Sequence, residues 1–286
     1  MKRFFTKLSF IDIVNVYSLW VVLGSFVTFC FFSKIFGVTP DYVAGAVLAL
    51  SIWIIYTADH LFDGFKLKDQ AISMRHKLHF EHRKILLPLI LFGFIACLLL
   101  VFGMLSKQYF RLGWFLCILT LIHFIINLAI SKKYKNRLFL KEVFIAAVVT
   151  LGFSILPLTA TLVYNWMSNL SIVVIAFFLL NLSNLLLFSY FDFETDEKSN
   201  FLSAAHVYGK EIALYITRIA ITVSIVLIVY LIYKQDLSLL GGIIIVLMNC
   251  ILLHISIYPD KYKQKGLYRF WGDFIYVIPA IAIPFL

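Results

Sequence analysis

Two segments of the chain each carry a pair of aspartates four residues apart. Asp59 and Asp63 follow an apolar run that ends at Ala58, and Asp192 and Asp196 follow a second apolar run of bilayer length. Residues four apart share one face of a helix, so each pair places two negative charges side by side if the helix continues. Such charges repel, and a hard divalent cation such as Mg²⁺ is the usual compensation. The spacing predicts that the four aspartates bind metal and, through it, a diphosphate.

A simpler interpretation is that these aspartates are solvated loop acids. Nearby lysines would balance them, namely Lys66, Lys68 and Lys198. The repetition of the pattern after two apolar runs favours the metal interpretation.

The composition fixes the class of protein that must position these acids. The chain is 62% hydrophobic and 14% charged, with a mean hydropathy of +0.96, so we expect a multi-pass membrane protein. In such a protein a net charge of +10 indicates orientation, and we expect no nucleic-acid partner. The four cysteines lie in apolar runs without metal-binding spacing and are expected to be inert thiols.

Nine apolar segments are long enough to be counted as spans. The first is interpreted as an uncleaved span, because it is too long for the apolar part of a signal peptide. We expect residues 1–286 to form one all-α domain, a bundle of nine transmembrane helices with a central cavity that opens to the cytoplasm. The expected spans are 11–32, 41–58, 85–105, 110–130, 139–164, 170–191, 211–233, 239–257 and 270–286.

The distribution of basic residues predicts the orientation. Most of the 25 lysines and arginines lie at the N-terminus or in every second connection, including 59–84 and 192–210. The positive-inside rule therefore places the N-terminus and both acid pairs in the cytoplasm, as expected in a bacterial inner (plasma) membrane.

Several polar residues interrupt the apolar runs. Asn181 and Asn184 precede Asp192 at helical spacing, on the same face. Unpaired polar groups are costly in lipid, so these residues should face a cavity or bond to another helix. Asn184 and Asp273 are the best candidates for lining a site. The other isolated cases are Asn15, His123, Asn127, Asn249 and His254.

A basic loop between the fourth and fifth expected spans is a further candidate. Lys132, Lys133 and Arg137 lie there, followed by Lys141. The positive-inside signal explains this loop by itself. In the functional interpretation, one or two of these cations neutralise diphosphate charge.

The combination resembles the UbiA-type membrane prenyltransferases over essentially the whole chain. That family has nine spans and an Asp-rich motif after the second and the sixth. Its second motif resembles D-x-E-x-D followed by G-x-x-[ST] and a final glycine. This chain has Asp192-Phe193-Glu194-Thr195-Asp196, with Asn200 in place of the first glycine, Ser203 at the Thr/Ser position and Gly209 at the end.

The first motif departs further from the family. Its second half matches Asp59 to Gly64, while Ile55 and Tyr56 stand where the family has Asn-Asp. The Arg-Thr-x-x-Arg-Pro run of the family is absent, and Arg75 and His76 are the residues that could replace it. In the sequence His76, His79 and His82 recur at helical spacing, and we expect them to coat the mouth of the site rather than line it.

The resemblance implies Mg²⁺-dependent transfer of an isoprenyl group from a polyprenyl diphosphate to a lipophilic, often aromatic, acceptor within membrane lipid. Asp59, Asp63, Asp192 and Asp196 would be the catalytic metal ligands. The substrate-binding candidates are Asn184, Lys132, Lys133, Arg137, Arg75, Lys198 and Asp273. The alternative is a non-catalytic carrier of a lipid or small molecule that keeps this fold. A CDP-alcohol phosphotransferase is excluded, because the residues after Asp63-Gly64 break its motif.

Overall fold

The structure is a computed structural model that describes residues 10–68, 72–129, 140–161, 169–199 and 201–286. Most of these residues are helical, and there is no strand among them. Six of the helices are long and apolar enough to span a membrane, which confirms a multi-pass membrane protein. They are α4 (Tyr42–Leu67), α6 (Arg83–Met104), α9 (Leu140–Thr161), α10 (Asn169–Lys198), α12 (Lys210–Tyr233) and α13 (Leu239–Ile257).

The remaining segments are shorter or less continuous. Two apolar helices are α3 (Leu19–Ile35) and α7 (Lys107–Ala129), and the short helices are α2 (Phe10–Val16), α5 (Met74–Glu81), α11 (Ala204–Tyr208), α14 (Pro259–Lys263) and α15 (Leu267–Phe274). Three 3₁₀ segments, η2 (Gln264–Gly266), η3 (Ile275–Ile281) and η4 (Ile283–Phe285), complete the described chain. By length and composition, the described residues therefore contain six spanning helices, and the expected count of nine is not reproduced.

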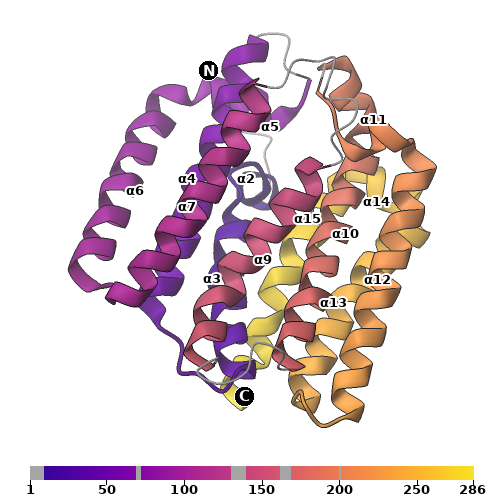
Figure 1. The fold of residues 1–286 in the computed structure, drawn as a ribbon. Coiled ribbons are helices and arrows are strands. Elements are labelled where there is room, and N and C mark those ends of the chain that lie inside the picture. The colour runs from indigo at the N-terminus through magenta and orange to yellow at the C-terminus, as the bar shows by residue number, and fades with distance from the viewer. Residues whose placement is uncertain (1–9, 69–71, 130–139, 162–168, 200) are drawn as a thin grey trace.

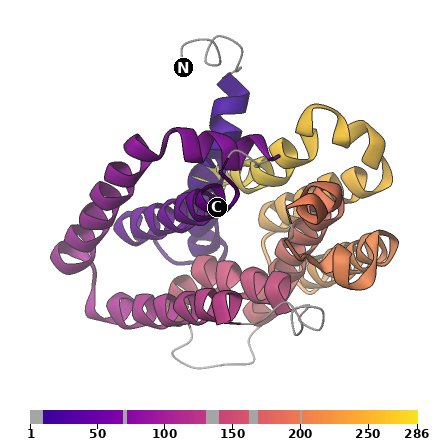
Figure 2. The ribbon, with the colours of Figure 1, turned by 90° about the horizontal axis from the view of Figure 1, so that it is seen from above.

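The first and last expected spans differ from simple helices for local reasons. Ser18 adopts a left-handed backbone conformation (φ 57°) and separates α2 from α3. Figure 1 shows α2 end-on and Figure 2 shows it from the side, so α2 lies across the bundle axis. After α15 the chain continues as 3₁₀ turns that contain Pro279 and Pro284, which lack the N–H groups that a continuous α-helix needs.

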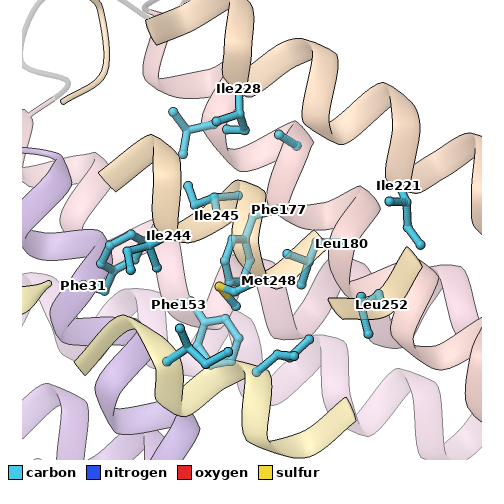
Figure 3. Packing of buried hydrophobic residues seen from close by; sticks show 14 of the residues in the cluster. Phe31, Phe153, Phe177, Leu180, Ile221, Ile228, Ile244, Ile245, Met248 and Leu252 are labelled. Atoms are coloured by element: carbon cyan, nitrogen blue, oxygen red, sulfur yellow. The ribbon is translucent and has the colours of Figure 1, made fainter. Parts of the chain in front are cut away.

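The core is built around α10. Of the 18 most apolar consecutive residues of α10, 56% are buried, whereas the figure for α6 is 11%. Helix α10 is therefore central and α6 faces outward. Figure 3 shows Phe177 and Leu180 of α10 packed among Ile245 and Met248 of α13 and Phe153 of α9. In Figures 1 and 2, α6 and α7 lie on the side of the bundle opposite α12.

Both acid pairs belong to helices, which is the condition under which the two aspartates of each pair share one face. α4 continues past Ala58 to Leu67, and α10 continues past Phe191 to Lys198. Asp41 caps the start of α4, with its Oδ1 accepting from the amides of Val43 and Ala44 at 3.0 Å. In Figure 1 the ends of α4 and α10 lie at the same end of the bundle as α5, α11 and α14. We call this the acid end.

Candidate functional site

Direct contacts at the acid end join the two segments that carry the aspartate pairs. We call these the acid segments: the first is the end of α4 with the following α5, and the second is the end of α10 with the residues that follow it. Phe201 follows α10, and its ring lies 5.8 Å from the His76 ring of α5 and 5.0 Å from Lys66 Nζ of α4. Gly64 permits this packing, because a Cβ there would lie 2.7 Å from the His76 carbonyl oxygen. Lys141, at the start of α9, acts electrostatically on both Asp59 and Asp196. The fold therefore gathers the two acid segments into one polar region.

Asp192 is held by the C-terminal part of the chain. Tyr268 Oη donates to Asp192 Oδ1 at 2.6 Å, and Arg269 forms an ion pair with Oδ2 through Nη2. The side chains of Arg269 and Asp192 are 28% and 17% exposed. Burial alone would lower the pKa of Arg269, but Asp192 and Tyr268 raise it above its ordinary value. Asp192 therefore carries a charge that a permanent cation neutralises.

Asp59 and Asp196 differ from Asp192. Neither side chain has a hydrogen bond or an ion pair within the part of the chain that the structure describes, and Asp59 is exposed. Lys141 is the cation that acts on both of them. These two carboxylates, one from each acid segment, are the ones available to an added cation.

Asp63 faces a histidine. His76 Nε2 lies 3.7 Å from Asp63 Oδ2. Burial and the neighbouring Arg269 lower the pKa of His76 to about 4, so the imidazole is neutral at neutral pH and the contact is not an ion pair there. At neutral pH His76 therefore supplies no positive charge to Asp63.

The histidines form a packed cluster. The His60 ring lies 5.7 Å from that of His76 and 5.3 Å from that of His79, and Tyr17 Oη lies 2.6 Å from His82 Nδ1. Burial lowers the pKa of His79 to about 4 as well. The expectation that the histidines coat the mouth is wrong for His79, which is 1% exposed and packs inside.

Arg75 is buried beneath the N-terminal helix. Its Nη1 lies 3.1 Å from His60 Nε2, and its Nη2 donates to the Asn15 carbonyl oxygen at 2.9 Å. Burial and the nearby Arg269 lower the pKa of Arg75 to about 10, which leaves the guanidinium charged at neutral pH. The structure thus places this substrate-binding candidate inside the acid end, on the side of α2.

A layer of hydrogen bonds joins α10 to the C-terminal segment. Asn184 Nδ2 donates to the Gly272 carbonyl oxygen at 3.0 Å, and Tyr276 Oη donates to Asn181 Oδ1 at 2.7 Å. Asn181 Nδ2 in turn donates to Thr150 of α9 at 2.7 Å. Bonding between helices, one of the two alternatives for such residues, therefore accounts for Asn181 and for Nδ2 of Asn184, while Oδ1 of Asn184 is buried without a partner among the described residues.

The other candidates are more scattered. Lys198 is exposed at the end of α10, and Asp273 is buried in α15 near Arg75 and Arg269. Lys132, Lys133 and Arg137 lie outside the described residues, as do the side chains of His123 and Asn127.

Sequence reasoning missed Tyr268 and Arg269. They are 76 and 77 positions from Asp192, and no local pattern connects them to it. It also missed Glu142, whose Oε1 accepts from the Ala204 amide at 2.8 Å and caps α11. The one available signal was a basic residue directly before the last apolar run, and orientation explained it equally well.

The described residues hold no group of three or more His, Cys, Asp or Glu side chains close enough to bind a metal ion. Mg²⁺ commonly takes one or two carboxylates and completes its shell with water and phosphate oxygens. Each acid pair supplies one available carboxylate, Asp59 or Asp196, so the type and number of donors fit those that Mg²⁺ takes.

The fold and the gathered polar residues define a multi-pass helical membrane protein with a charged site at one end of its bundle. Comparison with protein-family models, curated proteins and solved structures found no match to this chain.

Proposed function

We propose that this protein is a prenyltransferase that moves an isoprenyl group from a polyprenyl diphosphate to a lipophilic acceptor within the membrane. The observation that supports this most is a group of charged side chains at the acid end, where Phe201 lies against His76 and Lys66 and where Lys141 acts electrostatically on both Asp59 and Asp196. Such a group can hold a divalent cation together with an anionic head group.

Within this proposal the residues divide their work. Asp59 and Asp196 hold Mg²⁺, with Asp63 close by on the same face of α4. Bound Mg²⁺ neutralises the diphosphate and so makes it a better leaving group. Lys141 and Arg269 add permanent positive charge near the phosphates, and Asp192 keeps Arg269 in place. Lys198, Lys132, Lys133 and Arg137 are proposed as further cations at the mouth.

The test is transfer activity in purified protein. Asp59→Asn, Asp196→Asn and Asp192→Asn should each reduce transfer from a prenyl diphosphate by at least ~100-fold, because each changes the charge that holds the diphosphate. Asp260→Asn, which changes an exposed carboxylate at the same end, is the matched control and should keep full activity. Undiminished transfer in the Asp59 and Asp192 variants would reject the mechanism.

The proposal includes a membrane orientation. The acid end and the N-terminus face the cytoplasm of a bacterial cell. The chain crosses the membrane nine times if α3, α7 and the C-terminal segment also cross, and the prenyl chain extends into a central cavity. Single cysteines at positions 198 and 236, in a cysteine-free background, would test the sides. In intact cells, an impermeant maleimide should label position 236 and not position 198.

A second candidate is a non-catalytic carrier. Two features favour it. The first is that Ile55 and Tyr56 stand where the UbiA-type family, which this chain resembles, has Asn-Asp. The second is that Arg269 neutralises Asp192. Mass spectrometry of lipids from cells with and without the protein distinguishes the two. A prenyltransferase leaves a prenylated product missing from the deletion strain, whereas a carrier changes only where lipids accumulate.

A further inference from the structure

The guanidinium of Arg75 is buried, and its hydrogen-bond partners are neutral. Arg75 is 8% exposed, its Nη2 donates to the Asn15 carbonyl oxygen at 2.9 Å, and its Nη1 lies 3.1 Å from His60 Nε2. No described carboxylate lies within ion-pair distance of it, and Asp273 and Asp192 act on it electrostatically without such contact. An anionic oxygen binds a buried guanidinium more strongly than a carbonyl oxygen does, because it also neutralises the charge. The Asn15 carbonyl oxygen therefore occupies a position that suits an anion.

That carbonyl oxygen belongs to a helix that is joined to the bundle by one sharp bend. Helix α2 ends at Val16, and Ser18 leads into α3 with a left-handed backbone conformation (φ 57°) that non-glycine residues rarely adopt. The Ser18 amide donates to the same Asn15 carbonyl oxygen at 3.3 Å. In Figure 2, α2 extends outward from the bundle. A change of backbone conformation at Ser18 would therefore move α2, and the Asn15 carbonyl with it, away from Arg75.

Few contacts hold α2 in its present position. Besides the bond from Arg75, the Tyr17 hydroxyl lies 2.6 Å from His82 Nδ1 at the end of α5. Val14 and Val16 are buried, so apolar packing also favours this position. We call it the closed form of α2.

Buried polar atoms without partners are concentrated where the closed α2 meets the bundle. Ten buried side-chain nitrogen or oxygen atoms in the described parts of the chain have no hydrogen-bond partner. Five of them lie in the α2–α3 bend or on the histidines next to Arg75, namely Asn15 Oδ1, Ser18 Oγ, Trp20 Nε1, His60 Nδ1 and His76 Nδ1.

These unpartnered atoms include donors. The indole of Trp20 donates only, and the Ser18 hydroxyl can donate. A guanidinium also only donates, so His60 Nε2 accepts from Arg75 and the neutral ring carries its proton at the unpartnered Nδ1. Burying such groups unpaired is costly, so the closed form leaves polar groups unsatisfied that an entering anion or water can reach once α2 moves.

We propose that α2 is an autoinhibitory lid over an anion site at Arg75. In the closed form the Asn15 carbonyl oxygen takes the place of a phosphate oxygen, and in the open form a diphosphate binds the guanidinium instead. The diphosphate is either free or attached to a prenyl chain, and only the second case rests on the proposed function. Arg75 contacts His60, the residue after Asp59, so the site adjoins the segment to which that function assigns the diphosphate. Opening and binding form one equilibrium, in which easier opening gives tighter binding.

Maleimide labelling of α2 tests the lid. Asn15→Cys in a cysteine-free background keeps the backbone carbonyl and replaces a side chain whose Oδ1 has no partner. In lipid nanodiscs this cysteine should react slowly. Saturating inorganic pyrophosphate, with Mg²⁺ in excess, should raise its rate about tenfold or more, because the anion binds only the open form. Tyr233→Cys, at an exposed position at the far end of α12, is the control, and its rate should not change.

Two further changes in the Asn15→Cys protein separate the steps. Arg75→Gln removes both the contact with α2 and the anion site, so labelling should be fast without pyrophosphate and unaffected by it. Tyr17→Phe removes the hydrogen bond with His82. It should raise the rate without ligand, and lower the pyrophosphate concentration that gives half of the full response, each by about fivefold.

The response to pyrophosphate decides the inference. Its absence overturns the lid, as does an equal response in Arg75→Gln. If the glutamine variant does not fold, an unchanged half-response concentration in Tyr17→Phe overturns the lid instead. Geranyl S-thiolodiphosphate identifies the source of the anion. A response at lower concentrations than pyrophosphate supports a lid for prenyl diphosphates, and a response to pyrophosphate alone supports a lid for the free anion.

Transfer activity of the same samples separates this inference from the proposed function. Transfer without any response of α2 refutes only the lid. A response of α2 that depends on Arg75, in a protein without transfer, supports the lid and refutes only the prenyltransferase.

Discussion

The two acid segments share the pattern Asp-x-x-x-Asp but balance their charges by different means. In the second segment, Asp192 is paired with Arg269, a cation at any physiological pH. In the first, Asp63 faces His76, which is neutral at pH 7 because burial lowers its pKa to about 4. Equal spacing in the sequence therefore does not imply equal electrostatic states, since the partners come from remote segments.

The segments also differ in what attaches them to the bundle. The first is attached by contacts between rings and by hydrogen bonds to neutral side chains or backbone oxygens. Examples are the hydrogen bonds between Tyr17 and His82 and from Arg75 to the Asn15 carbonyl oxygen. The second is attached by an ion pair to α15 and by the hydrogen bonds of Asn184. We therefore expect the first segment to respond to pH and the second to the loss of single charges.

The largest effect should come from removing the cation of the second segment. Arg269→Gln leaves Asp192 partly buried without its ion pair and should destabilise the protein by about 3 kcal/mol. Thermal unfolding in detergent measures this. Lys263→Gln is the matched control, because its ion pair with Glu194 is exposed and the unfolding midpoint should not change. Equal midpoints for the two variants would show that the partly buried ion pair of Asp192 does not stabilise the second segment.

Acid should weaken the first segment. His76 and His79 have a pKa of about 4 in the folded protein against an ordinary value of 6.5. The unfolded chain therefore takes up protons first as the pH falls, so stability is fully present above about pH 6.5 and is lost toward pH 4. The loss reaches at most about 3 kcal/mol for each histidine.

Unfolding midpoints between pH 7.5 and 4.5 test this dependence. His79→Gln should remove part of the slope, because glutamine does not titrate. Equal slopes for the wild type and His79→Gln over this range would show that His79 is not buried as a neutral ring.

Added volume at the contact between α10 and α15 should have a smaller effect. A Cβ at Gly272 would lie 2.6 Å from Asn184 Oδ1 and 2.7 Å from a Phe188 ring carbon. Gly272→Ala should therefore cost about 1–3 kcal/mol through overpacking. Gly103→Ala is the control, because nothing lies within 4 Å of its Cβ position, and it should be neutral or slightly stabilising. Similar midpoints for both would mean that α15 can move away from α10.

The smallest effect should follow loss of one hydrogen bond in the first segment. Tyr17→Phe removes the hydroxyl that lies 2.6 Å from His82 Nδ1, and should cost about 1 kcal/mol. Tyr233→Phe, at an exposed position, should change nothing. If Tyr17→Phe costs as much as Arg269→Gln, then hydrogen bonding rather than packing attaches the first segment.

Much of the fold could be predicted from apolar runs. The segment 239–257 matches α13, whereas the expected spans 41–58 and 170–191 end before the acid pairs that α4 and α10 include. The last span was not foreseen as a series of 3₁₀ turns, although Pro279 and Pro284 were visible in it. The bend at Ser18 had no local signal, because serine is compatible with an unbroken helix.

The site was less predictable than the fold. The positions of the four aspartates at one end followed from counting spans, since alternate connections lie on one side. The partner of Asp192 did not, because Arg269 is brought there by the packing of α15 against α10. The burial of Arg75 was equally hidden, because a basic residue in a basic connection looks like an orientation signal.

The contact between Arg75 and Asn15 has a consequence for how the chain tolerates change. The guanidinium binds a carbonyl oxygen, an atom that every amino acid supplies at position 15. Substitutions at Asn15 should therefore be accepted widely in a saturation screen, while those at Arg75 should not. Position 18, where a positive φ separates α2 from α3, should accept glycine and asparagine and reject β-branched residues.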